Sequence, residues 1–405
     1  MKPRPTRLLA PGRPSFLFAA LLAGSSLAPS ALADTVRVPK DAPTLQAAID
    51  QAQDGDEILV SSGTYTGNVL VDGRADLRIA GKGKVILDGG GQGPALRVIG
   101  STGVRLEKLI FQGGQSEGFR ADVAPGLVLF RCQTRDNPGN GLTIDGCDDL
   151  VIERCKFVDD GAHAVQVDRS DRARLERNTV LRSGLDGLSL SNGLPSGQGS
   201  ADVVILKNVI KSAGKDGIDL HGTDGLVQQN RILKPFEDGL EVDSGGTGAS
   251  TRIELFKNLV RSAGRDGLRL NGADNRAERN TIVKAGNAGI KARGNGGHVV
   301  LTNKIMKAGG DGLELKPSAN GCTLEGNKIS RSLKDGIAIQ STGNTVTGNR
   351  VAKSDDNGLH IESSNNTVVD NRCTSSGDYG LHDTTGGNSY SGNVFKSVDP
   401  DGFEP

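Results

Sequence analysis

The most regular feature of the chain is a short unit of one polar residue, one glycine and one aliphatic residue. Typical forms are Asn140-Gly141-Leu142 and Asp216-Gly217-Ile218, each followed by alternating polar and apolar residues. From Gly118 to Gly402 the units, including variant forms, recur every 22 to 24 residues, apart from two intervals of 30 and 28 residues. A fixed period of this length is typical of a solenoid, in which each repeat packs on its neighbours.

A second series of polar residues follows the same period. It consists of Asn178, Asn208, Asn230, Asn258, Asn280, Asn303, Asn327, Asn349, Asn371 and Asn393, with Cys132 and Cys155 in the equivalent earlier positions. The segments between the two series are short and alternate in polarity, which indicates β-strands. We therefore predict an all-β fold, a right-handed parallel β-helix of roughly 22–24-residue coils. Stacked Asn side chains would bond neighbouring coils, and the glycines would supply the positive φ of the turns, so that both series are structural.

The residues before the repeats predict a cap for the solenoid. Apolar residues at Leu45, Ala48, Ile49 and Ala52 form one face of a short amphipathic helix. Such a helix would cover the open end of the first coil, as the terminal unit of a solenoid requires. No comparable cap is visible at the other end, so we expect a frayed last coil or self-association there.

The first 33 residues predict an export signal. They combine four basic residues, a short apolar run and an Ala-Leu-Ala ending, which together are typical of a cleaved secretory signal peptide. We therefore expect a periplasmic or secreted protein with a single domain over 34–405. Its cap and first coil would occupy 34–75, and its repeat coils 104–405.

The start of this domain carries a family resemblance. Thr44-Leu-Gln-Ala-Ala-Ile-Asp-Gln-Ala, followed by Gly55-Asp-Glu-Ile and Gly63-Thr-Tyr, resembles the opening of secreted β-helix proteins of the pectin lyase-like superfamily. With the repeats, the resemblance covers almost the whole chain after the signal. It implies the β-helix fold, whereas the superfamily includes lyases, hydrolases, esterases, epimerases and non-enzymatic members, so activity must be argued from the site.

Composition narrows the classes of function. Glycine is 58 of 405 residues, about twice the usual share, which suits a turn-rich solenoid. After residue 33 the chain has 44 basic and 48 acidic residues, which argues against attachment to nucleic acid by bulk charge. No apolar run is long enough to span a membrane. The five cysteines are an odd number, and buried thiols are the simplest interpretation.

The candidate site comes from the outward-facing residues that follow each glycine. Neighbouring coils lie about 4.8 Å apart, so acidic side chains of the middle coils should lie directly beside basic ones. The two long intervals, at Ser191–Ala201 and Asp243–Thr251, would add loops on either side and form a groove. The predicted site residues are Asp219, Glu241 and Asp243 as metal ligands, His221, Arg269 and Lys291 as catalytic residues, and Asp168, Arg293 and Lys316 as substrate-binding residues.

The favoured function is action on, or binding of, an acidic polysaccharide. Asp219, Glu241 and Asp243 offer hard oxygens suited to Ca²⁺, which with Arg269 would neutralise a uronate carboxylate and acidify its C5 proton. A nearby base would then remove that proton, leading to elimination or epimerisation. The pattern resembles that of Ca²⁺-dependent β-helix polysaccharide lyases, although the Asp-Pro-His sequence of alginate epimerases is absent.

Three alternatives remain open. Asp219 and Asp243 would lie about 8 Å apart, the spacing of an inverting glycosidase of the polygalacturonase-like type. The stacked pair His360 and His382, with Glu362, could hold a transition metal. Finally, the charges could merely pair across strands in a non-catalytic glycan-binding or structural protein, which the absence of Trp and the presence of only three Tyr favour.

Overall fold

The computed structural model describes residues 33–191, 200–243 and 250–397. The predicted export signal, apart from Ala33, and the central parts of the two predicted loops lie outside these residues. The chain after Ala33 clusters as one compact unit. Within the described residues, no helix is both long enough and apolar enough to cross a membrane.

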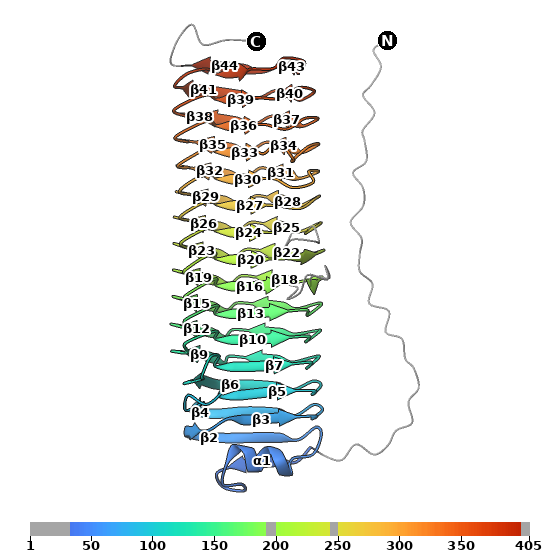
Figure 1. Ribbon diagram of the computed structural model, residues 1–405, viewed down its shortest axis with the longest axis vertical. Coiled ribbons are helices and arrows are strands. Elements are labelled where there is room, and N and C mark those ends of the chain that lie inside the picture. The colour runs from blue at the N-terminus through green and yellow to red at the C-terminus, as the bar shows by residue number, and fades with distance from the viewer. Residues whose placement is uncertain (1–32, 192–199, 244–249, 398–405) are drawn as a thin grey trace, which may run out of the picture. The chain divides into compact units, whose positions relative to one another are not determined.

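The predicted cap is present as a single short helix. Helix α1 (Leu45–Gln51) begins at Thr44, whose side-chain oxygen accepts a hydrogen bond from the Ala47 amide at 3.1 Å. Its buried face consists of Leu45, Ala48 and Ile49, as the apolar spacing predicts. The helix covers the first coil at the blue end of the solenoid (Figure 1).

The rest of the unit is a parallel β-helix whose coils stack along one axis (Figure 1), which confirms the predicted fold class. Each regular coil contributes one strand to each of three columns, and every pairing between coils is parallel. Four strands build the start of the large, 28-stranded sheet: β1 (Thr35–Val38), β2 (Glu57–Thr66), β4 (Arg78–Asp88) and β6 (Arg105–Gln112).

After β6 this sheet divides into two columns. The first column contains β8 (Val128–Phe130), β11 (Val151–Glu153), β14 (Arg174–Glu176), β18 (Val204–Leu206), β22 (Leu226–Gln228), β25 (Glu254–Phe256), β28 (Arg276–Glu278), β31 (Val299–Leu301), β34 (Thr323–Glu325), β37 (Thr345–Thr347), β40 (Thr367–Val369) and β43 (Ser389–Ser391). The second contains β9 (Gln133–Arg135), β12 (Lys156–Val158), β15 (Thr179–Leu181), β19 (Val209–Lys211), β23 (Arg231–Leu233), β26 (Leu259–Arg261), β29 (Thr281–Val283), β32 (Lys304–Met306), β35 (Lys328–Ser330), β38 (Arg350–Ala352), β41 (Arg372–Ser376) and β44 (Val394–Ser397).

The third column is a separate 14-stranded sheet, called here the site sheet. It contains β3 (Val69–Asp72), β5 (Leu96–Ile99), β7 (Phe119–Asp122), β10 (Leu142–Asp145), β13 (Val165–Asp168), β16 (Leu188–Ser191), β20 (Ile218–Leu220), β24 (Leu240–Val242), β27 (Leu268–Leu270), β30 (Ile290–Ala292), β33 (Leu313–Leu315), β36 (Ile337–Ile339), β39 (Leu359–Ile361) and β42 (Leu381–Asp383). A short pair, β17 (Ser200–Ala201) and β21 (Gly222–Thr223), completes the strands.

The predicted asparagine series forms a buried ladder. The backbone amide of Asn230 donates to Oδ1 of Asn258 at 2.9 Å, and the amide of Asn258 donates to Oδ1 of Asn280 at 2.8 Å. Asn258 Nδ2 also donates to the Val227 carbonyl at 2.8 Å, so each side chain satisfies two backbone groups of the preceding coil. Cys155 occupies the ladder as predicted, and all five cysteines are buried and unbridged.

The glycines of the repeat unit have a different role from the predicted one. Gly217 and Gly267 are not among the residues with positive φ, and that conformation falls instead on other residues, such as Lys257 directly before Asn258. A Cβ at Gly267 would lie 2.3 Å from Cγ2 of Ile282 and 2.5 Å from the carbonyl oxygen of Gly289. Glycine is required here because the core side chain and the next coil approach too closely for any Cβ.

Candidate functional site

The predicted stripe, in which acidic residues are followed by basic ones, exists and runs across the site sheet. Asp219 on β20 pairs in register with Glu241 on β24, which pairs with Arg269 on β27. Arg269 in turn pairs with Lys291 on β30, followed by Glu314 on β33. The acidic and basic residues therefore lie on directly adjacent strands, as the fixed period predicts.

The aspartates of the Asp-Gly units form a second ladder beside this stripe. Asp216 Oδ1 accepts from the Asp238 amide at 2.6 Å, and Asp238 Oδ1 accepts from the Asp266 amide at 2.7 Å. These side chains are buried, and Asp186 extends the series by accepting from the Asp216 amide at 2.9 Å. One oxygen of each carboxylate thus has the structural role predicted for the series.

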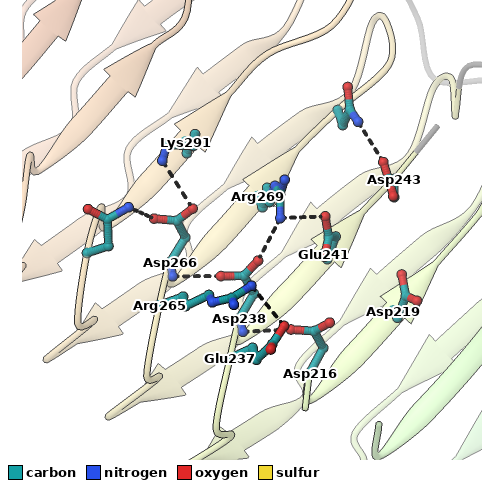
Figure 2. Close-up of polar contacts among 12 residues, drawn as sticks. Asp216, Asp219, Glu237, Asp238, Glu241, Asp243, Arg265, Asp266, Arg269 and Lys291 are labelled. Atoms are coloured by element: carbon teal, nitrogen blue, oxygen red, sulfur yellow. Dashed lines mark hydrogen bonds and ion pairs between the residues drawn. The ribbon is translucent and has the colours of Figure 1, made fainter. Parts of the chain in front are cut away.

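The second carboxylate oxygens of Asp238 and Asp266 reach the stripe, as Figure 2 shows. Oδ2 of Asp238 lies 3.3 Å from Nη1 of Arg269, which also lies 3.0 Å from Oε1 of Glu241. Lys291 Nζ lies 3.5 Å from Asp266 Oδ2 and 3.1 Å from Glu314 Oε2. Each basic residue of the stripe is therefore shared between a ladder aspartate and a stripe carboxylate.

Asp216, Asp238 and Glu241 form a compact group, called here the acidic cluster. One carboxylate oxygen from each lies within 4.8 Å of the other two. Burial, reinforced by the charges of Asp186, Asp238 and Glu241, raises the pKa of Asp216 to about 8. Burial also raises the pKa of Glu241 to about 7, with smaller contributions from neighbouring carboxylates and despite the lowering effect of Arg269. The cluster therefore holds more negative charge than the Arg269 guanidinium offsets, and it takes up a proton near neutral pH.

The remaining stripe residues surround the acidic cluster. His221 Nε2 lies 3.1 Å from Asp219 Oδ1; burial lowers the pKa of His221, but this bond and the neighbouring carboxylates raise it overall. Asp243 accepts a hydrogen bond from Asn271 Nδ2 at 2.6 Å. Arg293 Nη2 lies 4.0 Å from Glu241 Oε1, at the edge of ion-pair distance. Four predicted residues thus lie around Glu241, which itself belongs to the cluster.

Two predicted residues lie further away along the sheet. Asp168 is on β13, two strands before β20, and contacts Gln166 at 2.9 Å and Ser191. Lys316 follows β33; it contacts Glu314 and lies 3.3 Å from Gln340 Oε1. These two side chains could contact only distant parts of a long ligand that also covers the acidic cluster.

The alternative centre at the C-terminal end has a different arrangement. The rings of His360 and His382 stack with centroids 4.9 Å apart, and His360 Nδ1 lies 2.9 Å from Asp335 Oδ2. Across the described ranges, the acidic cluster is the group of three potential ligands whose atoms converge within 4.8 Å; His360, His382 and Glu362 do not form such a group.

Comparison with known protein families agrees with the observed fold. Residues 94–256 and 247–395 match the family described as the right handed beta helix region. The chain belongs to the right-handed β-helix family. A search of curated proteins finds no significant sequence match to this β-helix protein.

Solved structures with the same architecture are similar to this β-helix protein in fold alone, because their sequence identities are low. The periplasmic alginate epimerase AlgG, solved as a mutant, has a TM-score of 0.52 and 12% identity, covering 90% of this chain and 84% of its own. The catalytic domain of a GH87 α-1,3-glucanase in complex with tetrasaccharides has a TM-score of 0.60 and 12% identity, covering 90% of this chain and 71% of its own. The receptor-binding tailspike of bacteriophage Det7 has a TM-score of 0.54 and 12% identity, covering 92% of this chain and 77% of its own.

The donor set of the acidic cluster fits a hard divalent cation. Its three carboxylates supply oxygens, the ligands that Ca²⁺ prefers, and their excess negative charge favours a cation over further protons at alkaline pH. Of the three ligands predicted for this β-helix protein, Glu241 belongs to the set, while Asp219 and Asp243 lie beside it. Asp216 and Asp238 belong to this candidate set, whereas their place in the periodic series predicts a structural role alone. The sequence signal for them is that the aspartate of the Asp-Gly unit comes three residues before the outward residue of the stripe, as Asp238 does before Glu241.

Proposed function

We propose that this protein binds an acidic polysaccharide across the site sheet and acts on it beside the acidic cluster. The observation that carries the proposal is the in-register contact of Glu241 and Arg269, next to carboxylates that titrate near neutral pH. Glu241 on the stripe and Asp216 on the ladder beside it differ from ordinary surface ion pairs, because burial raises their pKa values to about 7 and about 8. Perturbed groups of this kind are a feature of functional sites.

Arg269 is the proposed contact for a uronate carboxylate. Its side chain is 20% exposed, and its guanidinium contacts both Glu241 and Asp238. When Glu241 takes up a proton, its hold on the guanidinium weakens, and a carboxylate of the polymer could replace it with a charge-assisted pair. Arg293, which is 36% exposed, would contact the next carboxylate along the polymer.

Proton transfer would involve His221 and the acidic cluster. Asp219 orients the His221 imidazole through the 3.1 Å contact and stabilises its charged form. An arginine that neutralises the uronate makes its C5 proton more acidic, so that a side-chain base such as His221 or Lys291 could remove it. At a pH where Glu241 is deprotonated, Ca²⁺ held by Asp216, Asp238 and Glu241 would instead supply that neutralisation as a Lewis acid. Return of a proton from the opposite face would give epimerisation, and loss of the C4 substituent would give elimination.

The similar folds support the polysaccharide class. An alginate epimerase and a glucanase bound to tetrasaccharides both use this architecture. The predicted export signal is consistent with a substrate outside the cytoplasm, and the periplasmic or secreted location remains part of the proposal.

The test is to incubate the purified chain with alginate, pectate and glycosaminoglycans, with and without Ca²⁺. Elimination produces an ultraviolet-absorbing unsaturated uronate, epimerisation changes the sugar ratio without cleavage, and hydrolysis produces reducing ends alone. Arg269→Ala and Glu241→Gln should abolish the change, whereas Arg252→Ala, which removes an exposed contact to Asp224 outside the site sheet, should leave it intact. Unchanged polymers, together with binding that survives both site variants, would contradict the proposal.

Inverting hydrolysis is the second candidate, and the raised pKa of Glu241 favours it. A general acid must hold its proton at the working pH, as a carboxyl with a pKa of about 7 does. Asp243, two residues further along the same coil, would then activate water, as the second of two separated carboxylates does in inverting glycosidases. Reducing ends without unsaturated product, lost in Glu241→Gln, would select this chemistry. Binding without any product would leave the glycan-binding alternative.

A further inference from the structure

One large aromatic side chain lies exposed at the corner that leads into the site sheet. Phe236, in the turn between β23 and β24, is 73% exposed. Its amide donates to the Ala213 carbonyl at 3.0 Å, and the Gly264 amide donates to the Pro235 carbonyl at 3.1 Å. These bonds place Gly214, Phe236 and Gly264 at equivalent positions of three successive coils.

The two neighbouring positions cannot carry side chains. A Cβ at Gly264 would lie 1.9 Å from the Phe236 carbonyl oxygen, and one at Gly214 would lie 2.1 Å from the Gly184 carbonyl oxygen. Glycine is therefore required at the equivalent positions of the coils before and after that of Phe236. These two coils have no side chain at that position to cover the Phe236 ring. A single exposed apolar residue is common, so exposure alone assigns no role.

The position of Phe236 next to the acidic cluster provides the second observation. Asp238, a cluster member, follows two residues later, and Glu237 between them lies 3.0 Å from Arg265 of the next coil. Glu241 is five positions after Phe236, so their Cα atoms are at most about 18 Å apart. A ligand of a few sugar units, lying across the coil, could contact both.

We propose that Phe236 is a stacking subsite for one sugar ring of the polysaccharide. This inference rests on the proposed function and adds a positioning residue to it. The flat, uncovered face of the phenyl ring would pack against the apolar face of a pyranose, while Arg269 holds a carboxylate of another unit. The subsite supplies the aromatic platform whose absence the lack of Trp suggests.

The experiment measures affinity for uronate oligosaccharides by titration calorimetry. Phe236→Ala should bind roughly threefold to tenfold more weakly than the parent chain, the range expected for loss of one aromatic stacking contact. Phe236→Tyr, which keeps a flat ring, should bind like the parent, and Phe236→Leu should bind like Phe236→Ala. Leu333→Ala is the matched control. Leu333 is 60% exposed and occupies the equivalent position four coils further on, where Asp335 takes the place of Asp238.

The outcomes separate the two proposals. If Phe236→Ala or Phe236→Leu binds like the parent while Arg269→Ala loses affinity, the stacking subsite is wrong and the proposed function stands. If Leu333→Ala is weakened as much as Phe236→Ala, the effect is a general property of the corner and the subsite is also wrong. If the parent chain binds none of the polymers, both proposals fail together.

Discussion

Nη1 of Arg269 lies 3.0 Å from Oε1 of Glu241, its direct neighbour on the adjacent strand of the site sheet. The same nitrogen lies 3.3 Å from Asp238 Oδ2, so one cation serves two carboxylates that are mostly buried. This sharing makes the charge of the site depend on pH, because any further negative charge must be offset by a proton or another cation.

Removal of this cation should destabilise the fold in a pH-dependent way. Arg269→Ala leaves Asp238 and Glu241 without their partner, at a cost of about 1–3 kcal/mol in the free energy of unfolding at pH ~8. Below the Glu241 pKa of about 7 the cost should shrink, because the protonated acid needs no cation. Denaturant unfolding at both pH values checks this. The matched control, Arg252→Ala, removes an exposed contact to Asp224 and should change stability by less than about 0.5 kcal/mol at either pH.

Neutralisation of the ladder aspartate should stabilise the protein at alkaline pH. The folded-state pKa of Asp216 is about 8, above its ordinary value of 3.8, so the folded chain holds a proton that the unfolded chain releases. That contribution is present at acid pH and is lost as the pH rises through about 8. Asp216→Asn should therefore gain at least about 1 kcal/mol at pH ~9, the equivalent of one pKa unit, and gain little at pH ~4.

The chain itself offers a precedent for this change. Asn357 occupies the same ladder position; its Oδ1 accepts from the Tyr379 amide at 3.3 Å and its Nδ2 donates to Asp335 Oδ1 at 2.9 Å. An amide at 216 can therefore keep the structural bond to the next coil. Calorimetric unfolding across this pH range is the measurement, and equal stability of variant and parent at pH ~9 would show that Asp216 carries no strained charge.

Calcium should stabilise the folded chain through the acidic cluster. A ligand that binds the folded state raises the unfolding temperature, and carboxylates bind Ca²⁺ only after losing their protons. The shift should therefore be larger at pH ~8.5 than at pH ~6, since the pKa values of Asp216 and Glu241 are about 8 and 7. Glu241→Gln should lose most of the shift. A shift that persists in this variant, or that Mg²⁺ and Na⁺ reproduce, would place the effect elsewhere on the surface.

The asparagine ladder should be intolerant of truncation. Asn258→Ala removes the 2.8 Å bond to the Val227 carbonyl and the acceptor for the Asn230 amide at 2.9 Å. Because these groups are buried, the change should lower the free energy of unfolding by about 2 kcal/mol or more. Thermal unfolding measures it, and Asn393→Ala in the last described coils should cost less because Asn393 is only partly buried. Equal losses at the two positions would contradict a dependence on burial.

Much of the fold follows from the sequence alone. The period of the Asp-Gly and Asn units predicts stacked coils, and stacking in register then predicts that Asp219, Glu241, Arg269 and Lys291 adjoin one another. The helix at Leu45–Gln51 follows from apolar spacing. These features are local or strictly repetitive, so a single rule, one coil per period, converts sequence positions into spatial neighbours.

Other features required the tertiary structure. The sequence treats Gly267 as a turn residue, whereas the next coil and Ile282 leave no space for its Cβ. It likewise treats Asp216 and Asp238 as structural, although the second oxygen of Asp238 contacts Arg269 and Asp216 converges with Asp238 and Glu241 within 4.8 Å. Periodicity determines which coils adjoin, but side-chain rotamers, burial and distances of a few ångströms determine which atoms share a charge. The acidic cluster, and with it the pH dependence of the site, is therefore a property of the folded chain.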